Sequence, residues 1–218
     1  MGEFLAQQGY SVLGIRLAGH ATQPEDLNRV RWQDWLYSIE DGYHLLKGVS
    51  TQIFICGLSL GAALSLYFAT RFTVSGIVGM STPQELPADP RIKFIHIFKW
   101  FIPYHKKEIT KWQDPETEES HIQYPVHPTF AVAELQSFLR VMRVTLPELT
   151  TPTLLIHSRT DDQVHPDNAK LIFQRLGSQD KEIAWIEASD HNVLLDPGHE
   201  KVFHLIKNFI WRISENNK

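Results

Sequence analysis

The chain has 218 residues, of which 43% are hydrophobic and 21% charged, enough apolar material for one domain with a large core. Its formal net charge of −4 and its scattered basic residues argue against nucleic acid as a partner. A single cysteine, Cys56, excludes an intrachain disulfide and is consistent with a reducing compartment. No apolar stretch is long enough to span a bilayer, and the first residues lack the pattern of a signal peptide. We therefore expect a cytoplasmic protein.

Short apolar runs alternate with helical patterns, which is typical of a mostly parallel sheet with helices on both faces. The first residues predict a short helix that ends at Gly9, followed by a strand at 10–15. A stripe of Trp35, Ile39, Tyr43 and Leu46 predicts a helix from about 32 to 46. The later predicted elements are strands at 52–56, 75–80, 153–157 and 182–187, and helices at 60–70, 168–176 and about 200–213.

Residues 83–129 interrupt this alternation with several prolines, a dense aromatic run at 93–104 and a charged tract. They are either a surface loop with one packed helix or a cap inserted over an active site. We favour the cap, because an insertion this long in a compact domain is usually functional. The chain then divides into a first core part at 1–82, a cap at 83–129 and a second core part at 130–218.

The pattern with the clearest chemistry is Gly57-Leu58-Ser59-Leu60-Gly61. A serine hydroxyl becomes a nucleophile only when it is exposed beside a base. A strand–turn–helix elbow exposes it, and the turn needs small residues two places before and after the serine. The apolar run QIFIC before the pattern and the helix-forming run after it provide that context. The alternative is a tight turn with a solvated serine.

A base and an acid that could serve Ser59 follow two later strands. Asp161 and Asp162 come just after the strand at 153–157, and His191 comes just after the next strand. The carboxyl ends of parallel strands meet at one edge of a sheet, where ligands bind in open α/β folds. The residues alone therefore predict a serine, a histidine and one of two aspartates at that edge.

Several segments together resemble small bacterial carboxylesterases and monoacylglycerol lipases of the α/β-hydrolase superfamily. They are EFLAQQGYSVLGI, LAGHATQPEDL, WQDWLYSIEDGYHLLK, ICGLSLGAALSL, TPTLLIHSRTDDQVHPDNA and SDHNVLLD. The resemblance implies the α/β-hydrolase fold and a serine hydrolase that forms an acyl-serine intermediate. The implied substrates are short- to medium-chain acyl esters or monoacylglycerols, and no cofactor or metal is implied.

The resemblance also assigns roles residue by residue. Asp161 matches the family's acid, because Val164 and Pro166 follow it at the family's spacing, so Asp162 is not the acid. His191 matches the base, and Leu60 the residue whose N–H provides one oxyanion donor. His20 matches a loop histidine that is more often structural. Two departures are Asp190 and Ala21, which stand where the family commonly has glycine.

One family feature has no counterpart here. The family has an earlier strand, ending in a His-Gly-aromatic turn with the second oxyanion N–H, between the strands that match 10–15 and 52–56. Met1 falls inside the helix that should follow that strand. The chain is then truncated, or another chain such as a homodimer partner supplies the strand, or the two flanking strands have closed together. A non-catalytic or weakly active binding protein is the alternative function.

Overall fold

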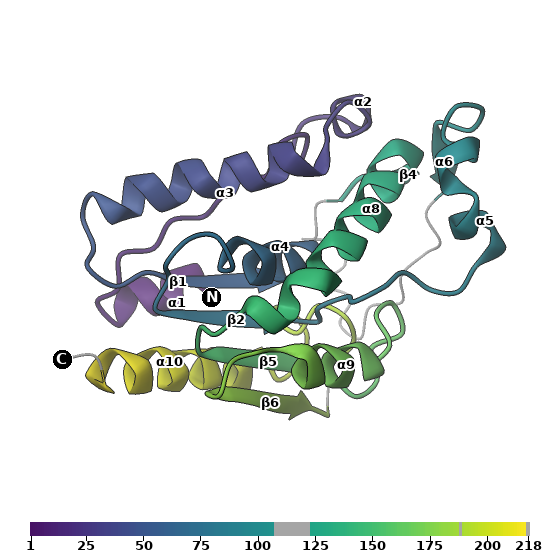
Figure 1. The fold of residues 1–218 in the computed structure, drawn as a ribbon. Helices are drawn as coiled ribbons and strands as arrows, with labels where there is room; N and C mark the ends of the chain where they lie inside the picture. The colour runs from purple at the N-terminus through teal and green to yellow at the C-terminus, as the bar shows by residue number, and fades with distance from the viewer. Residues whose placement is uncertain (107–122, 188, 217–218) are drawn as a thin grey trace.

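A parallel sheet lies at the centre of the computed structural model, which describes residues 1–106, 123–187 and 189–216 (Figure 1). Within those residues the sheet has four strands in the order β1-β2-β5-β6. The strands are β1 (Phe54–Leu58), β2 (Gly76–Met80), β5 (Thr153–Ser158) and β6 (Lys181–Ile186). All three pairings are parallel, so the four carboxyl ends meet at one edge.

Helices cover both faces of this sheet (Figure 1). One face carries α3 (Trp32–Lys47), α4 (Leu60–Phe68), α8 (Thr129–Thr145) and α9 (Asp167–Arg175). The opposite face carries α1 (Gly2–Gln7) and α10 (His199–Asn216). The short helices are α2 (Pro24–Leu27), α5 (Pro90–Lys93), α6 (Ile95–Phe98) and the 3-10 turn η1 (Leu146–Glu148).

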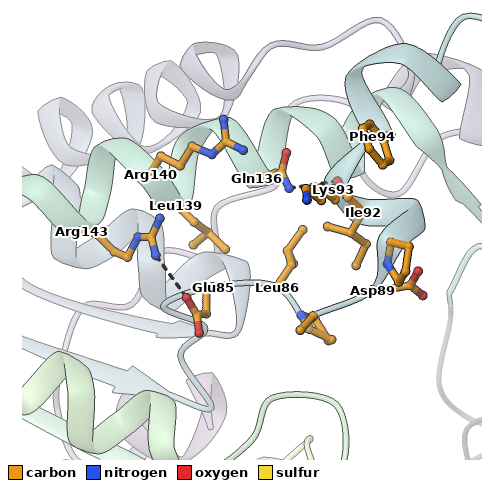
Figure 2. A pocket seen from close by; sticks show the side chains of 13 residues that line it. Glu85, Leu86, Asp89, Ile92, Lys93, Phe94, Gln136, Leu139, Arg140 and Arg143 are labelled. Carbon is orange, nitrogen blue, oxygen red and sulfur yellow. Dashed lines mark hydrogen bonds and ion pairs between the residues drawn. The ribbon is translucent and has the colours of Figure 1, made fainter.

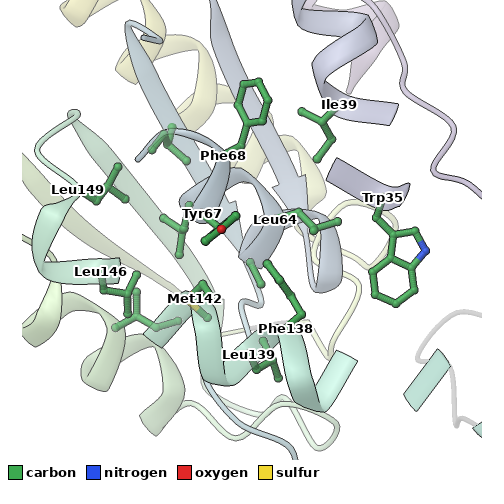
Figure 3. Close-up of a cluster of buried hydrophobic side chains, with 14 of the residues drawn as sticks. Trp35, Ile39, Leu64, Tyr67, Phe68, Phe138, Leu139, Met142, Leu146 and Leu149 are labelled. Atoms are coloured by element: carbon green, nitrogen blue, oxygen red, sulfur yellow. The ribbon is translucent and has the colours of Figure 1, made fainter. Parts of the chain in front are cut away.

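The alternation of side chains along the strands builds two cores. In β5, Leu155 packs toward α4 and α8, whereas Leu154 and Ile156 pack toward α10. Figure 3 shows the first core, where Tyr67 of α4 and Phe138 of α8 meet edge to face at 5.7 Å between ring centroids. Each such buried side chain stabilises the fold by about 1.5–3 kcal/mol. The two cores fix the sheet edge on which the site depends.

Most of the predicted elements are confirmed, with ends that differ by at most three residues. The predicted architecture, a parallel sheet between two layers of helices, is confirmed. The stripe of Trp35, Ile39 and Tyr43 is buried as predicted. Among the described residues, no helix combines the length and the apolar character that a bilayer crossing requires.

The prediction of a strand at 10–15 is wrong. A strand exists only where a neighbour completes its backbone hydrogen bonds, and no described strand lies beside this segment. Instead Ile15 packs on α3 at Gly42, where a Cβ would lie 2.0 Å from the Ile15 side chain. Val12 and Leu13 remain exposed. The idea that the strands at 10–15 and 52–56 close together is therefore also wrong, and β1 pairs with β2 alone among the described strands.

The segment between β2 and α8 leaves the sheet and contains α5, α6 and the strand pair β3 (Tyr104–Lys106) and β4 (Val126–Pro128). Residues 107–122 of the predicted cap lie outside the described residues. Hydrogen bonds join the described part to the segment after α1: Tyr124 Oη donates to Gly19 O at 2.9 Å and accepts from Thr22 N at 2.9 Å, and Asn28 Nδ2 donates to Pro103 O at 3.0 Å. Some of the aromatic side chains at 93–104 face solvent, since Trp100 and Phe101 are exposed.

Candidate active site

Ser59 occupies the sharp turn between β1 and α4. Its backbone has φ 53° and ψ −116°, a strained conformation for a residue with a side chain. The Ser59 N–H donates to Met80 O at 2.8 Å, which fixes the turn against β2. A Cβ on Gly57 would lie 2.3 Å from the Gly61 carbonyl, so the turn requires glycine at 57. A Cβ on Gly61 would meet no atom within 4 Å, so only one of the two glycines has the steric role that the sequence predicted for both.

Asp161 lies just beyond β5 and is buried, whereas Asp162 is exposed. Oδ1 of Asp161 accepts hydrogen bonds from Val164 N at 2.8 Å and Gln163 N at 3.0 Å. Its Oδ2 lies 2.9 Å from Nδ1 of His191. The geometry thus joins His191 to Asp161, which is the aspartate that the family resemblance indicates.

A second histidine, His157, contacts the same carboxylate from inside β5. Its Nε2 lies 2.8 Å from Val164 O and 3.3 Å from Asp161 Oδ2. Because a carbonyl oxygen can only accept, Nε2 carries the proton and donates to both oxygens. His157 was not singled out by the sequence analysis. A polar residue at the last strand positions, four before the acid, was the available signal.

These contacts set the charge of Asp161. Burial alone would raise the pKa of this carboxyl. The hydrogen bonds donated by His157 and His191, and the charge of a protonated His191, outweigh burial and hold the pKa of Asp161 well below its usual range. Asp161 is therefore a carboxylate at neutral pH, and it favours the His191 tautomer with its proton on Nδ1.

The loop that carries His191 is fixed by a buried aspartate. Asp196 Oδ2 accepts from Ser189 Oγ at 2.9 Å and from Asp190 N at 2.8 Å. Ser81, just after β2, donates from Oγ to the His191 carbonyl at 2.7 Å. The His191 side chain is 13% exposed, so its free Nε2 edge can reach solvent or a ligand.

The structure brings Asp161 and His191 into contact, whereas it shows no hydrogen bond between His191 and the Ser59 hydroxyl. Among the described residues, the Ser59 hydroxyl makes no hydrogen bond, to His191 or to any other group. All three nevertheless lie at the carboxyl edge of the sheet, since Ser59 N bonds to Met80 O and the next residue, Ser81, bonds to the His191 carbonyl. Catalytic hydrogen bonds are often long before substrate binds.

The family resemblance also singled out Leu60 and His20, and only Leu60 lies directly beside Ser59. Leu60 is the first residue of α4, so no carbonyl of that helix can accept its N–H, and the positive end of the helix dipole lies there. His20 lies in the loop before α2, where its ring packs edge-on against Trp35. Burial lowers the pKa of His20. Its neighbour Ala21 has φ 53°, the conformation that a glycine would adopt without strain.

Other chemistry at this edge is not supported by the described residues. The Cys56 thiol lies in β1, and burial raises its pKa to about 12, so it does not form a nucleophilic thiolate at neutral pH. No three histidine, cysteine or acidic side chains of the described ranges gather closely enough to hold a metal ion.

Comparison with known proteins places this geometry in a family. Residues 1–198 match the family described as serine aminopeptidase, S33 (Hydrolase_4). The chain belongs to this family of α/β-hydrolases. The family is one of serine hydrolases.

Two proteins with similar sequences come from bacilli. A carboxylesterase of Bacillus subtilis (strain 168) is 27% identical over 217 residues, covering 97% of this chain and 87% of that protein. A thermostable monoacylglycerol lipase of Bacillus sp. (strain H-257) is 33% identical over 198 residues, covering 90% and 77%. Among solved structures, one from work on the metagenome-derived lipolytic enzymes LipS and LipT has a TM-score of 0.90 at 28% identity, covering 97% and 86%.

Proposed function

We propose that this chain hydrolyses carboxylic esters with Ser59 as nucleophile, His191 as general base and Asp161 as the acid that orients His191. The observation that carries the proposal is the 2.9 Å contact between buried Asp161 and His191, at the same sheet edge as the strained Ser59 turn. An aspartate in that position holds the imidazole tautomer and stabilises the imidazolium that forms.

The reaction follows from these positions. Ser59 Oγ attacks the ester carbonyl while His191 Nε2 takes the serine proton. The N–H of Leu60 faces the negative oxygen that develops, and the N-terminal end of α4 favours that charge. His191 then donates its proton to the leaving alcohol and activates a water that releases the acid from the serine. We propose short- to medium-chain acyl esters or monoacylglycerols as substrates, on the strength of the two bacillar relatives' names.

The test is turnover of p-nitrophenyl esters from acetate to decanoate, and of a monoacylglycerol, by the full chain and by Ser59→Ala. Ser59→Ala removes one oxygen and leaves the fold intact, so hydrolysis should fall to the rate without enzyme. His191→Ala should cost about as much, because such residues act as a unit. Retention of most activity by either folded variant would overturn the assignment.

The alternative is a weakly active or non-catalytic binding protein of the same fold. Two observations on the described residues favour this alternative: none of them forms a hydrogen bond with the Ser59 hydroxyl, and none of their strands pairs with the outer edge of β1. A fluorophosphonate probe separates the two functions, since only an activated serine reacts with it at a useful rate.

A further inference from the structure

A cavity of about 570 Å³ lies away from the candidate active site, between residues 85–94 and α8 (Figure 2). None of Ser59, Asp161 and His191 lines it. Its volume is in the range of sites that hold small organic ligands. Nothing in the proposed reaction uses it.

The middle of the cavity is apolar. Leu86 and Ile92 come from the segment after β2, Leu139 comes from α8, and Figure 2 shows the three side chains converging. Leu139 is 2% exposed and belongs to the core beneath, so this floor is held by packing. An apolar floor of this kind accommodates a hydrocarbon chain.

The rim carries more positive charge than the described carboxylates balance. Across the mouth Arg143 Nη1 pairs with Glu85 Oε2 at 3.2 Å, and Asp89 pairs with Arg91 at 2.6 Å, so both rim carboxylates are already used. Lys93 on one wall and Arg140 on the other form no ion pair with any described residue, and both are exposed. Two cationic residues thus line the same cavity, Lys93 from α5 and Arg140 from α8.

An apolar floor below two cations matches an anion with a hydrocarbon tail. We propose that the cavity binds a fatty-acid anion, with the tail on Leu86, Ile92 and Leu139 and the carboxylate between Lys93 and Arg140. A charged carboxylate gains hydrogen bonds from both cations, while a short anion such as acetate or phosphate cannot cover the floor. This site goes beyond the proposed function, because binding there requires neither Ser59 nor catalysis. If the chain is an ester hydrolase, the ligand belongs to the same class as its product acid.

The experiment is calorimetric titration of sodium decanoate, below its micelle concentration, into the full chain carrying Ser59→Ala. We expect saturable binding that weakens about tenfold or more in Arg140→Glu and in Lys93→Glu, since each change removes a charge-assisted contact and adds repulsion. Lys201→Glu is the matched control, because Lys201 is an exposed lysine of α10 that does not line the cavity. It should bind decanoate as the parent does.

Further ligands test the two parts of the site. Acetate and inorganic phosphate should bind at least tenfold more weakly than decanoate, and decyltrimethylammonium should not bind at all. Three results would overturn the proposal: no saturable decanoate binding, equal affinity in the parent and both charge-reversed variants, or equal binding of the cationic detergent. Decanoate binding at the candidate active site would give the second result, so it is distinguishable. Thermal unfolding of each variant shows that its fold is retained.

Discussion

Gly57 and Gly61 flank Ser59 at equal distances in the sequence, but the fold uses them differently. The missing side chain of Gly57 is what lets the first turn of α4 approach β1, because a Cβ would overlap the Gly61 carbonyl. Gly61 has open space where a Cβ would be. The strained backbone of Ser59 therefore depends on one glycine rather than on a symmetric pair.

Gly57→Ala should consequently displace Ser59 and lower both stability and turnover. Forcing a methyl group into a packed turn costs about 1–3 kcal/mol, and a shift of about 1 Å in a nucleophile can cost about 100-fold in rate. Gly61→Ala should keep the fold, and it adds up to about 1 kcal/mol of helix stability. Thermal unfolding together with ester turnover compares the two, and equal damage in both variants would contradict this interpretation of the turn.

Asp161 and Asp162 offer a second matched pair. Asp161→Asn should lower kcat by about 10⁴, because an amide in that place favours the wrong imidazole tautomer. Asp162 is exposed, so Asp162→Asn should change kcat less than about twofold. Steady-state kinetics on one ester measures both. A more severe loss in Asp162→Asn would mean that the acid has been assigned one residue too early.

The residue scale also shows what the sequence could and could not predict. The contact of Asp161 with His191 was predictable, since strand ends and the family spacing of Val164 both pointed to it. The His157 contact to the same carboxylate has only the position of a polar residue near the end of β5 as a signal, because the contact depends on how the loop after β5 folds back over the strand. The hydrogen bond from Ser81 to the His191 carbonyl joins residues 110 positions apart in the sequence, so no local pattern predicts it.

At the scale of elements, the periodicity of apolar residues predicted the helices and strands whose formation depends on packing against the core. The stripe on α3 and the short apolar runs of the sheet follow from helical and strand periodicity. The segment at 10–15 has the same apolar character as the strands, yet it is not one, because strand formation depends on a partner elsewhere in the chain. The result is an outer edge of β1 whose backbone groups no described strand completes.

The open edge leads to a prediction about turnover. The resemblance assigns the second oxyanion N–H to a strand on this side of β1, and loss of one such donor costs about 10²–10³ in rate. Residues 1–218 by themselves should then hydrolyse esters slowly, and the same residues preceded by a strand that ends in a His-Gly turn should have a kcat higher by that factor. The same extension with prolines in the strand is the control, since proline cannot donate to a ladder.

Two measurements are needed for that extension: ester turnover and molecular mass in solution. An extended chain that remains monomeric and gains no turnover would contradict the role given to the edge. A rate typical of esterases in the chain without the extension would contradict it as well.

At the scale of the whole molecule, Asp161 links the candidate site to acid stability. Its pKa is lowered in the folded protein relative to about 3.9 in an unfolded chain. The carboxylate therefore stabilises the folded state at pH values above about 4, and this contribution is lost as pH falls through the lower folded pKa. Urea unfolding should show that wild type is more stable than Asp161→Asn at pH 7. This difference in the free energy of unfolding, the gap between the two proteins, should narrow between pH 5 and pH 3. A gap that stays constant over that range would contradict the shift, and Asp162→Asn should show no comparable gap at any pH.

The central claim is that the fold activates Ser59 through His191 and Asp161, and a covalent probe tests it most directly. The folded chain is treated with a fluorophosphonate, digested, and mapped by mass spectrometry. We expect one adduct, on the peptide that contains Ser59, formed much more slowly in Asp161→Asn and absent in Ser59→Ala. A folded chain that stays unlabelled, or an adduct on another residue that persists in Ser59→Ala, would contradict the claim.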